Sequence, residues 1–517
     1  MSDKGTHDID ERLKALINNA AAARVVTQAV EGTIGPRGLD TMMVDSFGDV
    51  VITNDGVTIL KWMEINHPAA QMVINAARAQ QADAGDGTTT ATIMAGTMIS
   101  EGASQVLKGV PVAQVIDGIR RGVAAAEAEI KAQTRPAAGF DDPLLYQTAR
   151  IAGRGDESIA RLVLEAARET GMETLKDPVF KLADQVVGNP RGDSELLAGV
   201  IVSRGPVNRD MPETLDAARI LVLDDYLRPE EFESEALHTE AGFKVYQELR
   251  EQYRRDLDAL AEAGVSLVLT SKNIDDLAES VLTEAGILVI QRASHHELEH
   301  TARHTGARIV KRKALQREPE QISKYLGSAK RVEYREELAH FRISGGAGQQ
   351  AAAILVGAVT AEVVEERERI ARDAAAAVQK ALLGGVVPGG GSIELWAAQR
   401  LEAAARETGG LPSYGVLCVK EALERPFACI VGNAGFNPLE KLVAAVSRQQ
   451  ETGQPGWAVD CETGEIRDMT EIGVFDPTPV KLTALTTAGE VAAAILRINT
   501  VVKKRDAQKN GASKIEW

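Results

Sequence analysis

The spacing of apolar residues predicts helices at both ends of the chain and strands in its middle. A helical stripe runs through residues 9–32, and Gly32 follows it as the expected end of the helix. Two strand-like runs, residues 42–45 and 49–53, meet around Phe47-Gly48 and predict a hairpin. The residues of the first stripe are Leu13, Leu16, Ile17, Ala20 and Val25.

Two more helices are predicted before residue 130. The first follows Gly85 with apolar residues spaced by three and four, and Pro111 opens the second. Their expected buried positions are Ala95, Ile99, Ala103 and Val106, then Val112, Val115, Ile116, Ile119 and Val123. Alanine clusters recur here and after residue 357, and small side chains let helices pack closely. Both ends of the chain are therefore expected to be helical.

Runs of Ile, Leu and Val in the middle of the chain predict strands that are buried on both faces. Helical patterns at residues 273–285 and 295–305 separate the last three runs, which favours a parallel sheet. The turn Thr270-Ser271-Lys272-Asn273 contains no glycine, which argues against a dinucleotide site. The runs are residues 199–203, 219–223, 265–269, 286–290 and 307–310.

A charged insert at about residues 228–255 interrupts this region. Its second half places Phe243, Tyr246, Leu249 and Tyr253 at helical spacing, which predicts an amphipathic helix projecting from the sheet. A solvated surface helix is the simpler alternative. Helical ends around a sheet-containing middle indicate that one domain is interrupted by an insertion.

Composition narrows the class of protein. A chain of 517 residues suggests about three domains, and 58 basic against 74 acidic residues, a net charge of -16, disfavour nucleic acid or an anionic membrane as partner. Cys418, Cys429 and Cys461 lack disulfide or metal spacing, which favours a reducing cytosol, with small buried apolar residues as their simplest role. Residues 1–11 are polar, and no apolar run is expected to reach the roughly 18 residues of a membrane helix.

The segment Gly85-Asp86-Gly87-Thr88-Thr89-Thr90 is the strongest chemical signal. Glycines let the backbone approach an anion, hydroxyls and helix amides can surround it, and the carboxylate calls for a cation, so the segment suggests a site for a magnesium nucleotide. The alternative is an ordinary helix start that Asp86 or Thr88 caps. The chain has no Gly-Lys pair, which excludes an ordinary P-loop.

Further carboxylates could complete such a site. Phosphoryl transfer uses one carboxylate to hold a metal and another to orient water. Asp55 and Asp476 lie in tight turns and are more often turn formers, while Asp373 precedes an alanine run and forms an expected i,i+4 pair with Arg369. Their value lies in occurring together with the phosphate-type segment.

A rival signal is His296-Glu297-Leu298-Glu299-His300, which fits the H-E-x-x-H pattern of zinc peptidases. His304 extends the row but lies roughly 12 Å from His296 along a helix, too far to share one ion. The helix is expected between two parallel strands, with the histidines turned to solvent. A peptidase is therefore the weaker hypothesis, and a scaffold with a vestigial nucleotide site is a third.

Taken in order, the motifs resemble those of the chaperonin family over nearly the whole chain. The resemblance rests on residues 33–38, 53–56, 85–90, 366–373 and 388–391 and on Asp476-Pro477. It implies a multidomain α+β subunit of an ATP-driven, protein-folding double ring. The expected domains are a helical equatorial one at 1–132 and 384–517, a small intermediate one at 133–196 and 352–383, and an apical α/β one at 197–351 with a helical protrusion.

The resemblance also implies roles for individual residues. Asp86 would hold Mg²⁺, and Asp55 and Asp373 would position the attacking water. Arg154 stands where many relatives carry a lysine that senses the terminal phosphate, and Arg37 likewise replaces a lysine; a planar arginine fork could change that sensing. The expected ATP-binding residues are Thr33, Ile34, Gly35, Pro36, Gly87, Thr88, Thr89, Thr90, Arg154, Gly390, Asp460 and Asp476.

The insert at about 228–255 resembles the built-in lid of group II chaperonins, and the chain lacks the Gly-Gly-Met-rich tail usual in group I. A lidded group II ring, or a lidded bacterial ring of group III, is therefore implied, without a separate co-chaperonin. Expected partners are unfolded proteins and further copies of the chain in two stacked rings, with eightfold symmetry. ATP and Mg²⁺ are the expected ligands, K⁺ is a further candidate, and a cytoplasmic location is expected.

Overall fold

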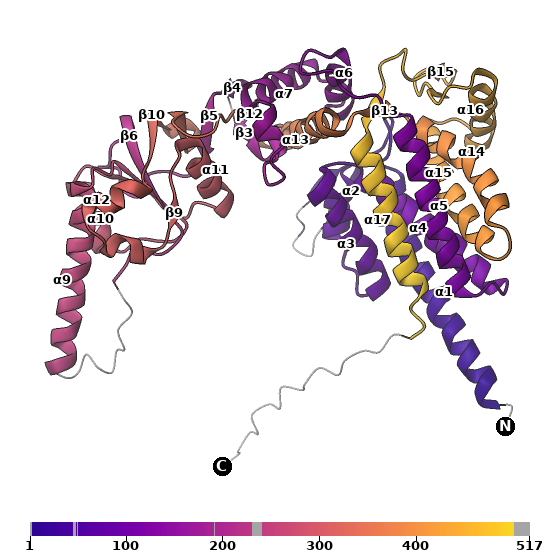
Figure 1. The fold of residues 1–517 in the computed structure, drawn as a ribbon, viewed down its shortest axis with the longest axis horizontal. Coiled ribbons are helices and arrows are strands. Elements are labelled where there is room, and N and C mark those ends of the chain that lie inside the picture. Colours follow the sequence, from indigo (N-terminus) through magenta and orange to yellow (C-terminus); the bar gives the residue numbers. More distant parts are fainter. Residues whose placement is uncertain (1–2, 45–47, 49, 191, 230–239, 501–517) are drawn as a thin grey trace. The chain divides into compact units, whose positions relative to one another are not determined.

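The computed structural model describes residues 3–44, 48, 50–190, 192–229 and 240–500. The chain divides into two compact units, Met1–Ala137 with Gly384–Trp517 and Ala138–Leu383, here called the first and second unit. The first unit is therefore built from both ends of the chain, and the second unit is inserted between them. The elements of both are labelled in Figure 1.

The first unit is mainly helical. Its helices are α1 (Asp3–Glu31), α2 (Gly56–Trp62), α3 (Pro68–Ala84), α4 (Thr88–Leu107), α5 (Val112–Ala132), α14 (Ser392–Thr408), α15 (Pro412–Asn433), α16 (Pro438–Thr452) and α17 (Thr478–Leu496). Its strands form antiparallel pairs, β1 (Thr41–Val44) with β2 (Val50–Thr53), β13 (Val386–Pro388) with β16 (Phe475–Pro477), and β14 (Trp457–Val459) with β15 (Ile466–Asp468).

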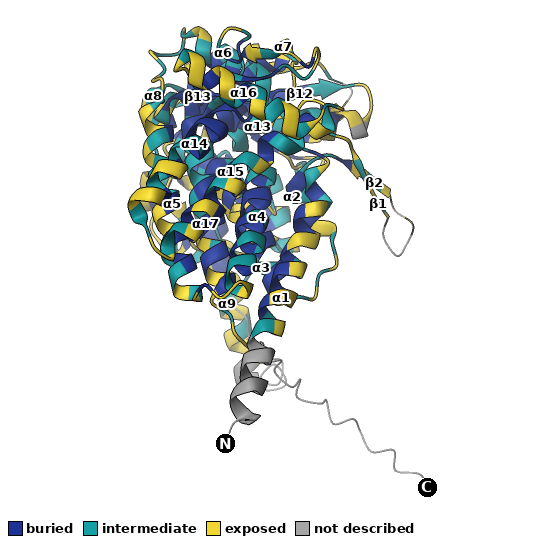
Figure 2. Ribbon diagram, turned by 90° about the vertical axis from the view of Figure 1, so that its right-hand side faces the viewer, coloured by how far each residue is buried: buried dark blue, intermediate teal, exposed yellow. Residues whose placement is uncertain are grey.

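Small residues bring these helices close together. At Gly118 of α5 and Gly415 of α15, a methyl group would overlap the backbone of the other helix. Ile119 and Val419 of the same two helices are fully buried in one continuous core. The alanine and glycine content of both chain ends thus allows close helix packing, and buried residues run along α4, α15 and α17 (Figure 2).

Several sequence predictions for this unit are confirmed. The hairpin forms with Thr41 opposite Thr53, although residues 45–47 and 49 lie outside the described residues. The stripes predicted for α4 and α5 are buried or half-buried. The stripe predicted for α1 is partly wrong, because Ile17 is 47% and Val25 57% exposed. Ala23, Val26 and Val30 are buried in the core instead, because packing against α3 and α4 rather than apolar character alone selects the inner face.

The prediction that no apolar run is long enough for a membrane helix is also wrong. By length and composition alone, α17 could cross a membrane. Half of its most apolar 18-residue window is buried, and it packs against α3, α4 and α5. Its apolar character therefore belongs to the core of the helical unit.

The second unit contains two sheets. The larger has the order β5-β11-β10-β6-β7-β8, with β9 also paired to β6, and the smaller has the order β3-β12-β4. The strands are β3 (Val186–Pro190), β4 (Glu195–Leu197), β5 (Gly199–Val202), β6 (Thr214–Leu223), β7 (Leu267–Thr270), β8 (Leu288–Ile290), β9 (Ile309–Val310), β10 (Gly327–Arg335), β11 (His340–Gly346) and β12 (Ala353–Ala358).

Helices cover both sheets. The α-helices are α6 (Pro143–Ala152), α7 (Glu157–Thr170), α8 (Met172–Leu175), α9 (Glu240–Glu262), α10 (Asp276–Glu284), α11 (His295–Thr305), α12 (Pro319–Ile322) and α13 (Ala361–Gly384). The short 3₁₀ helices are η1 (Leu182–Gln185), η3 (Arg312–Gln316), η4 (Ser323–Tyr325) and η5 (Glu336–Leu338). One apolar core lies at the larger sheet, and another joins α7, α13 and the smaller sheet.

The predicted parallel arrangement is confirmed for β6, β7 and β8, which pair in that order, and for β9, which pairs with β6. The antiparallel half of the sheet, β10 and β11, was not predicted. These strands alternate between buried Val332 and exposed Arg331, and their charged outer residues mask the strand pattern.

The predicted projecting helix corresponds to α9, while residues 230–239 of the insert lie outside the described residues. The two ends of α9 differ. Tyr253, Leu257 and Leu260 are buried in the core of the larger sheet, and Tyr253 Oη donates to Asp275 Oδ1 at 2.9 Å. Phe243 is 50% exposed. The helix is thus anchored at its C-terminal half and carries an exposed aromatic residue towards its start.

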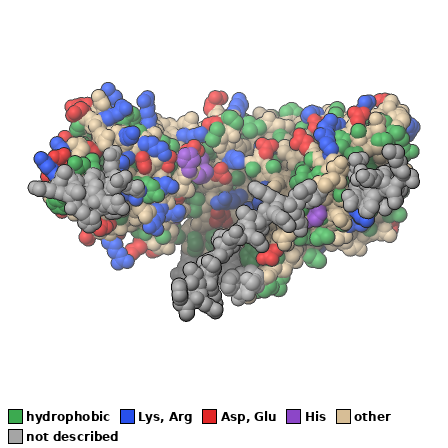
Figure 3. All heavy atoms as spheres, turned by 90° about the horizontal axis from the view of Figure 1, so that it is seen from below, with side chains coloured by type: hydrophobic (Ala, Val, Ile, Leu, Met, Phe, Trp, Pro, Cys, Tyr) green, Lys and Arg blue, Asp and Glu red, His purple; other side chains and the backbone are tan. Residues whose placement is uncertain are grey.

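On the face seen in Figure 3, basic and acidic side chains are intermixed.

Candidate nucleotide site

The phosphate-type segment forms the joint between α3 and α4. Gly85 ends α3 and Gly87 precedes α4, both in the left-handed region with φ of 75° and 78°. Asp86 Oδ1 accepts from the Gly87 amide at 2.6 Å, but no side chain caps α4. The predicted alternative of an ordinary capped helix start is therefore wrong, and the first-turn amides keep their capacity to bind an anion.

The segment is held against the start of α17. Gln80 Nε2 donates to Asp86 O at 2.8 Å and to Val480 O at 3.3 Å. A Cβ at position 87 would lie 2.8 Å from Val480 Cγ1, so the backbone passes too close for any other residue. Thr88 is buried and Thr89 and Thr90 are half-buried at the first turn of α4.

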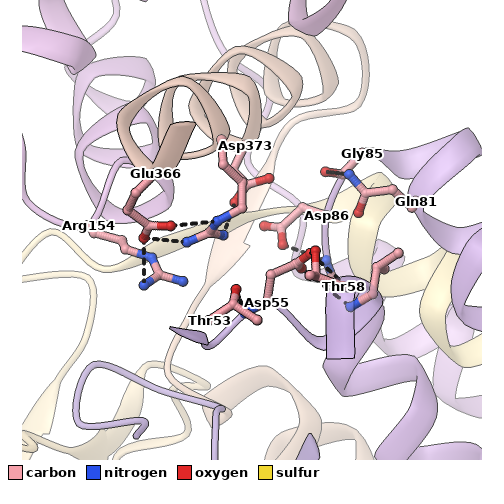
Figure 4. Close-up of polar contacts among 12 residues, drawn as sticks. Thr53, Asp55, Thr58, Gln81, Gly85, Asp86, Arg154, Glu366 and Asp373 are labelled. Atoms are coloured by element: carbon pink, nitrogen blue, oxygen red, sulfur yellow. Dashed lines mark hydrogen bonds and ion pairs between the residues drawn. The ribbon is translucent and has the colours of Figure 1, made fainter. Parts of the chain in front are cut away.

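Asp55 begins α2 beside this segment. Its carboxylate accepts from the Thr58 amide at 3.0 Å and the Thr58 hydroxyl at 2.6 Å, so its expected role as a turn former is real (Figure 4). The next residue, Gly56, lies against α4, where an added Cβ would be 2.5 Å from Thr89 Oγ1. The turn around Asp55 therefore contacts the threonines of the phosphate-type segment.

The electrostatics of Asp86 are those of a carboxylate suited to a cation. Burial raises the pKa of Asp86, and the carboxylates of Asp476 and Asp55 add to the rise, whereas the Gly87 amide and the Lys481 ammonium oppose it. A divalent cation would stabilise the charged form of such a carboxylate, and it takes carboxylate oxygens together with phosphate oxygens. The donor set thus fits Mg²⁺ bound with a nucleotide.

Two charged residues joined to Asp476 by ion pairs, Lys481 directly and Glu394 through it, were not predicted. Lys481 Nζ lies 2.7 Å from Asp476 Oδ2 and 2.7 Å from Glu394 Oε1. The side chains of Lys481 and Glu394 are only 12% and 3% exposed. The available sequence signal was weak, because each residue simply occupies the first turn of a helix that follows a predicted nucleotide residue.

The remaining predicted residues of the first unit lie in loops around its elements. Thr33, Ile34, Gly35 and Pro36 follow α1, where Asn433 Nδ2 donates to Ile34 O at 2.9 Å. Gly35 and Gly390 both have a positive φ, of 90° and 65°. The side chain of Met469 lies close to Gly390.

Asp460 is the least suited of the predicted residues. Its Oδ1 accepts from the Glu462 amide at 2.9 Å and its Oδ2 pairs with Arg467 at 3.3 Å. The hydrogen bond from the Glu462 amide is the main cause that lowers the pKa of Asp460. The carboxylate therefore already stabilises its own turn.

Asp373 and Arg154 belong to the second unit, where they are joined by a chain of ion pairs. Arg154 Nη1 lies 3.6 Å from Glu366 Oε1, and Glu366 accepts from Arg369 Nη2 at 2.6 Å. Arg369 Nη1 in turn lies 3.2 Å from Asp373 Oδ2, which confirms the predicted i,i+4 pair (Figure 4). Arg154 is also strained, with a positive φ of 53°.

The histidines of this row, His296, His300 and His304, were expected to face solvent, and this is wrong for two of them. His300 and His304 are 8% and 5% exposed. Gln185 Nε2 lies 2.8 Å from His300 Nδ1, and the His304 ring bonds to Gln349 O and the Gly346 amide. Hydrogen bonds rather than a metal satisfy these rings, and the described residues hold no cluster of three or more potential His, Cys, Asp or Glu metal ligands.

Comparison with known proteins agrees with this arrangement. The sequence profile described as the TCP-1/cpn60 chaperonin family matches residues 26–506. A thermosome subunit of Pyrococcus abyssi is 33% identical over 518 residues, covering 95% of this chain and 93% of the relative. The thermosome subunit alpha of Archaeoglobus fulgidus is 34% identical over 511 residues, with 95% and 92% covered. The crystal structure of a group III chaperonin in the open state matches with a TM-score of 0.81 and 44% identity, covering 96% of this chain and all of that one.

Proposed function

Because the chain belongs to the TCP-1/cpn60 chaperonin family and is an ATP-dependent subunit of a double-ring folding chamber, we propose that it binds ATP with Mg²⁺ at the start of α4. The uncapped first turn of α4, with left-handed Gly87 before it and three threonines on it, carries this proposal. The zinc-peptidase hypothesis has no comparable support, since its histidines are buried and hydrogen-bonded.

Each residue of the first unit has a distinct proposed part. The amides at the start of α4 and the hydroxyls of Thr88, Thr89 and Thr90 bind the β- and γ-phosphates, and Asp86 holds Mg²⁺. When bound, Mg²⁺ neutralises the phosphate oxygens on which charge develops. Asp476 and the loops at Thr33–Pro36 and Gly390 surround the adenosine; the part of Asp460 is weaker, because its own turn engages it.

Hydrolysis is proposed to require the second unit. Asp373 accepts a hydrogen bond from the attacking water and orients it in line with the γ-phosphate, and Asp55 assists from the first unit. Arg154 neutralises the terminal phosphate. Because Asp373 and Arg154 lie in the second unit, we propose that turnover occurs only in a subunit conformation that brings them to the nucleotide, which couples chemistry to the shape of the ring.

The finer points of assembly are also proposals. The subunit assembles into eightfold rings of one chain type, works in the cytoplasm and captures non-native proteins. The exposed start of α9, with Phe243, supports a lid over the chamber in place of a separate co-chaperonin. K⁺ is proposed as an accessory cation.

Replacing Asp373 by Ala tests the proposed chemistry. Turnover should fall about 100-fold or more while ATP affinity stays near that of the parent, because Asp373 contacts water rather than the nucleotide. Phosphate release and equilibrium nucleotide binding measure the two quantities. Asp117→Ala is the matched control, since Asp117 also forms an i,i+4 pair with an arginine. Parent-like phosphate release from Asp373→Ala would remove Asp373 from the mechanism, and no release from the parent would indicate a vestigial site.

A further inference from the structure

The buried pair Lys481 and Glu394 has no part in the mechanism described so far. Lys481 Nζ lies 2.7 Å from both Glu394 Oε1 and Asp476 Oδ2. With side-chain exposures of 12% for Lys481 and 3% for Glu394, the two charges have been removed from water. A charged group is rarely kept in such a place unless its partners are fixed around it.

The lysine connects three elements that carry or adjoin predicted nucleotide residues. It lies in the first turn of α17, next to Val480, whose carbonyl accepts from the same Gln80 amide that fastens the phosphate-type segment. Glu394 lies in the first turn of α14, immediately after the turn that contains Gly390. Asp476 lies on β16, opposite Val387.

The position of Asp476 depends on this lysine. Asp476 Oδ2 is the atom that Lys481 binds, and it lies 3.1 Å from where a Cβ of Gly389 would be. The carboxylate is therefore held between a glycine turn and an ammonium group.

We propose that Lys481 is a positioning residue for ATP, which fixes the Asp476 carboxylate for the adenosine. Glu394 holds the lysine from its other side. The inference rests on the proposed nucleotide site. A merely structural salt bridge would instead influence ATP binding only through the stability of the fold.

The first experiment compares two lysines of the same kind. Lys420 also bridges two carboxylates within the first unit, Glu402 at 3.4 Å and Glu424 at 3.2 Å, and its side chain is 19% exposed. In equilibrium binding to the full chain, Lys481→Met should weaken ATP and ADP about tenfold or more, since a charged hydrogen bond to Asp476 is lost. Lys420→Met should change both affinities less than about twofold. Equal affinities in Lys481→Met and the parent would overturn the proposal.

A second variant separates positioning from stability. Removing Lys481 alone leaves a buried carboxylate without its partner, so Lys481→Met is expected to lower Tm. Combining it with Glu394→Gln removes one charge of each sign and should restore much of Tm, while ATP affinity stays about tenfold or more below the parent. Recovery of affinity together with Tm would show that Lys481 is structural and overturn the proposal.

If the parent chain itself fails to bind ATP, the proposed site fails; if the parent binds and Lys481→Met binds equally well, only the role of Lys481 fails.

Discussion

The ion pairs around the residues proposed for ATP chemistry differ between the two units in how exposed their members are. In the first unit, Asp476 shares Lys481 with Glu394, and these three side chains are 25%, 12% and 3% exposed. In the second unit, Glu366 and Asp373 pair with arginines while 45% and 22% exposed. Buried pairs with one geometry are costly to rearrange, whereas exposed pairs exchange partners at little cost. The first unit therefore suits binding, and the second suits a step that switches on and off.

The loop that carries Arg154 is also held by ion pairs to α13. Asp156 caps α7 and pairs with Arg367 of α13 at 3.3 Å, while Arg154 pairs with Glu366 on the same helix. Ion pairs thus fasten the loop along α13, and its strained residue is the one proposed to sense phosphate. Arg154 can leave Glu366 for a phosphate without disturbing the buried core.

The largest effect is expected from a change in the closely packed binding segment of the first unit. Gly87→Ala would force a Cβ into the 2.8 Å contact with Val480 Cγ1 at a φ of 78°, so ATP affinity should fall about 100-fold or more. Equilibrium binding measures it. Gly453→Ala is the control, because Gly453 has a φ of 68° but no atom within 4 Å of an added Cβ. It should cost about 1 kcal/mol of stability and leave binding intact. Similar losses of affinity in both variants would refute the close-contact argument.

A smaller effect is expected from a buried group of the second unit, His300, whose burial should make stability depend on pH. Burial lowers the pKa of His300 to about 4, with His296 adding to the effect. The unfolded chain, with an ordinary pKa near 6.5, binds the proton more readily, so stability is retained above that pH and lost as pH falls towards 4. Between pH 7 and 5 the loss from His300 should be about 2 kcal/mol.

Denaturant unfolding of the second-unit transition at the two pH values checks this expectation. His300→Gln should remove about that much of the pH dependence, even if it lowers stability at pH 7. His295→Gln is the control, because the His295 side chain is 69% exposed. An unchanged pH dependence in His300→Gln would show that the buried ring is not responsible.

The smallest effect is expected from a change in the exposed ion pairs of the second unit. Glu366→Gln weakens the pairs with Arg154 and Arg369, yet stability should change within about 0.5 kcal/mol because the groups are exposed. Turnover should fall about two- to threefold, because Arg154 loses the carboxylate of α13 that positions it. Combining Glu366→Gln with Arg154→Gln should slow turnover no further than Arg154→Gln alone. Fully multiplicative losses would separate Glu366 from Arg154.

Local patterns in the sequence predicted much of the fold and of the phosphate-type segment. The β1–β2 hairpin, the parallel strands β6, β7 and β8, and the left-handed glycines around Asp86 depend on neighbouring residues, and their patterns are explicit. The inner face of α1 and the burial of His300 depend instead on what other elements pack against them. Lys481 and Glu394 escaped notice for the same reason, since their pairing exists only once α17 lies beside α14.

The two-part character of α9 has a mechanical consequence. The helix has 23 residues and is therefore about 34 Å long. Its C-terminal half is bound into the core through Tyr253, Leu257 and Leu260. Such an element behaves as a cantilever. A load applied near Phe243 reaches the Tyr253–Asp275 hydrogen bond, and Asp275 also caps α10, so a pull at the tip bears directly on the sheet that supports it.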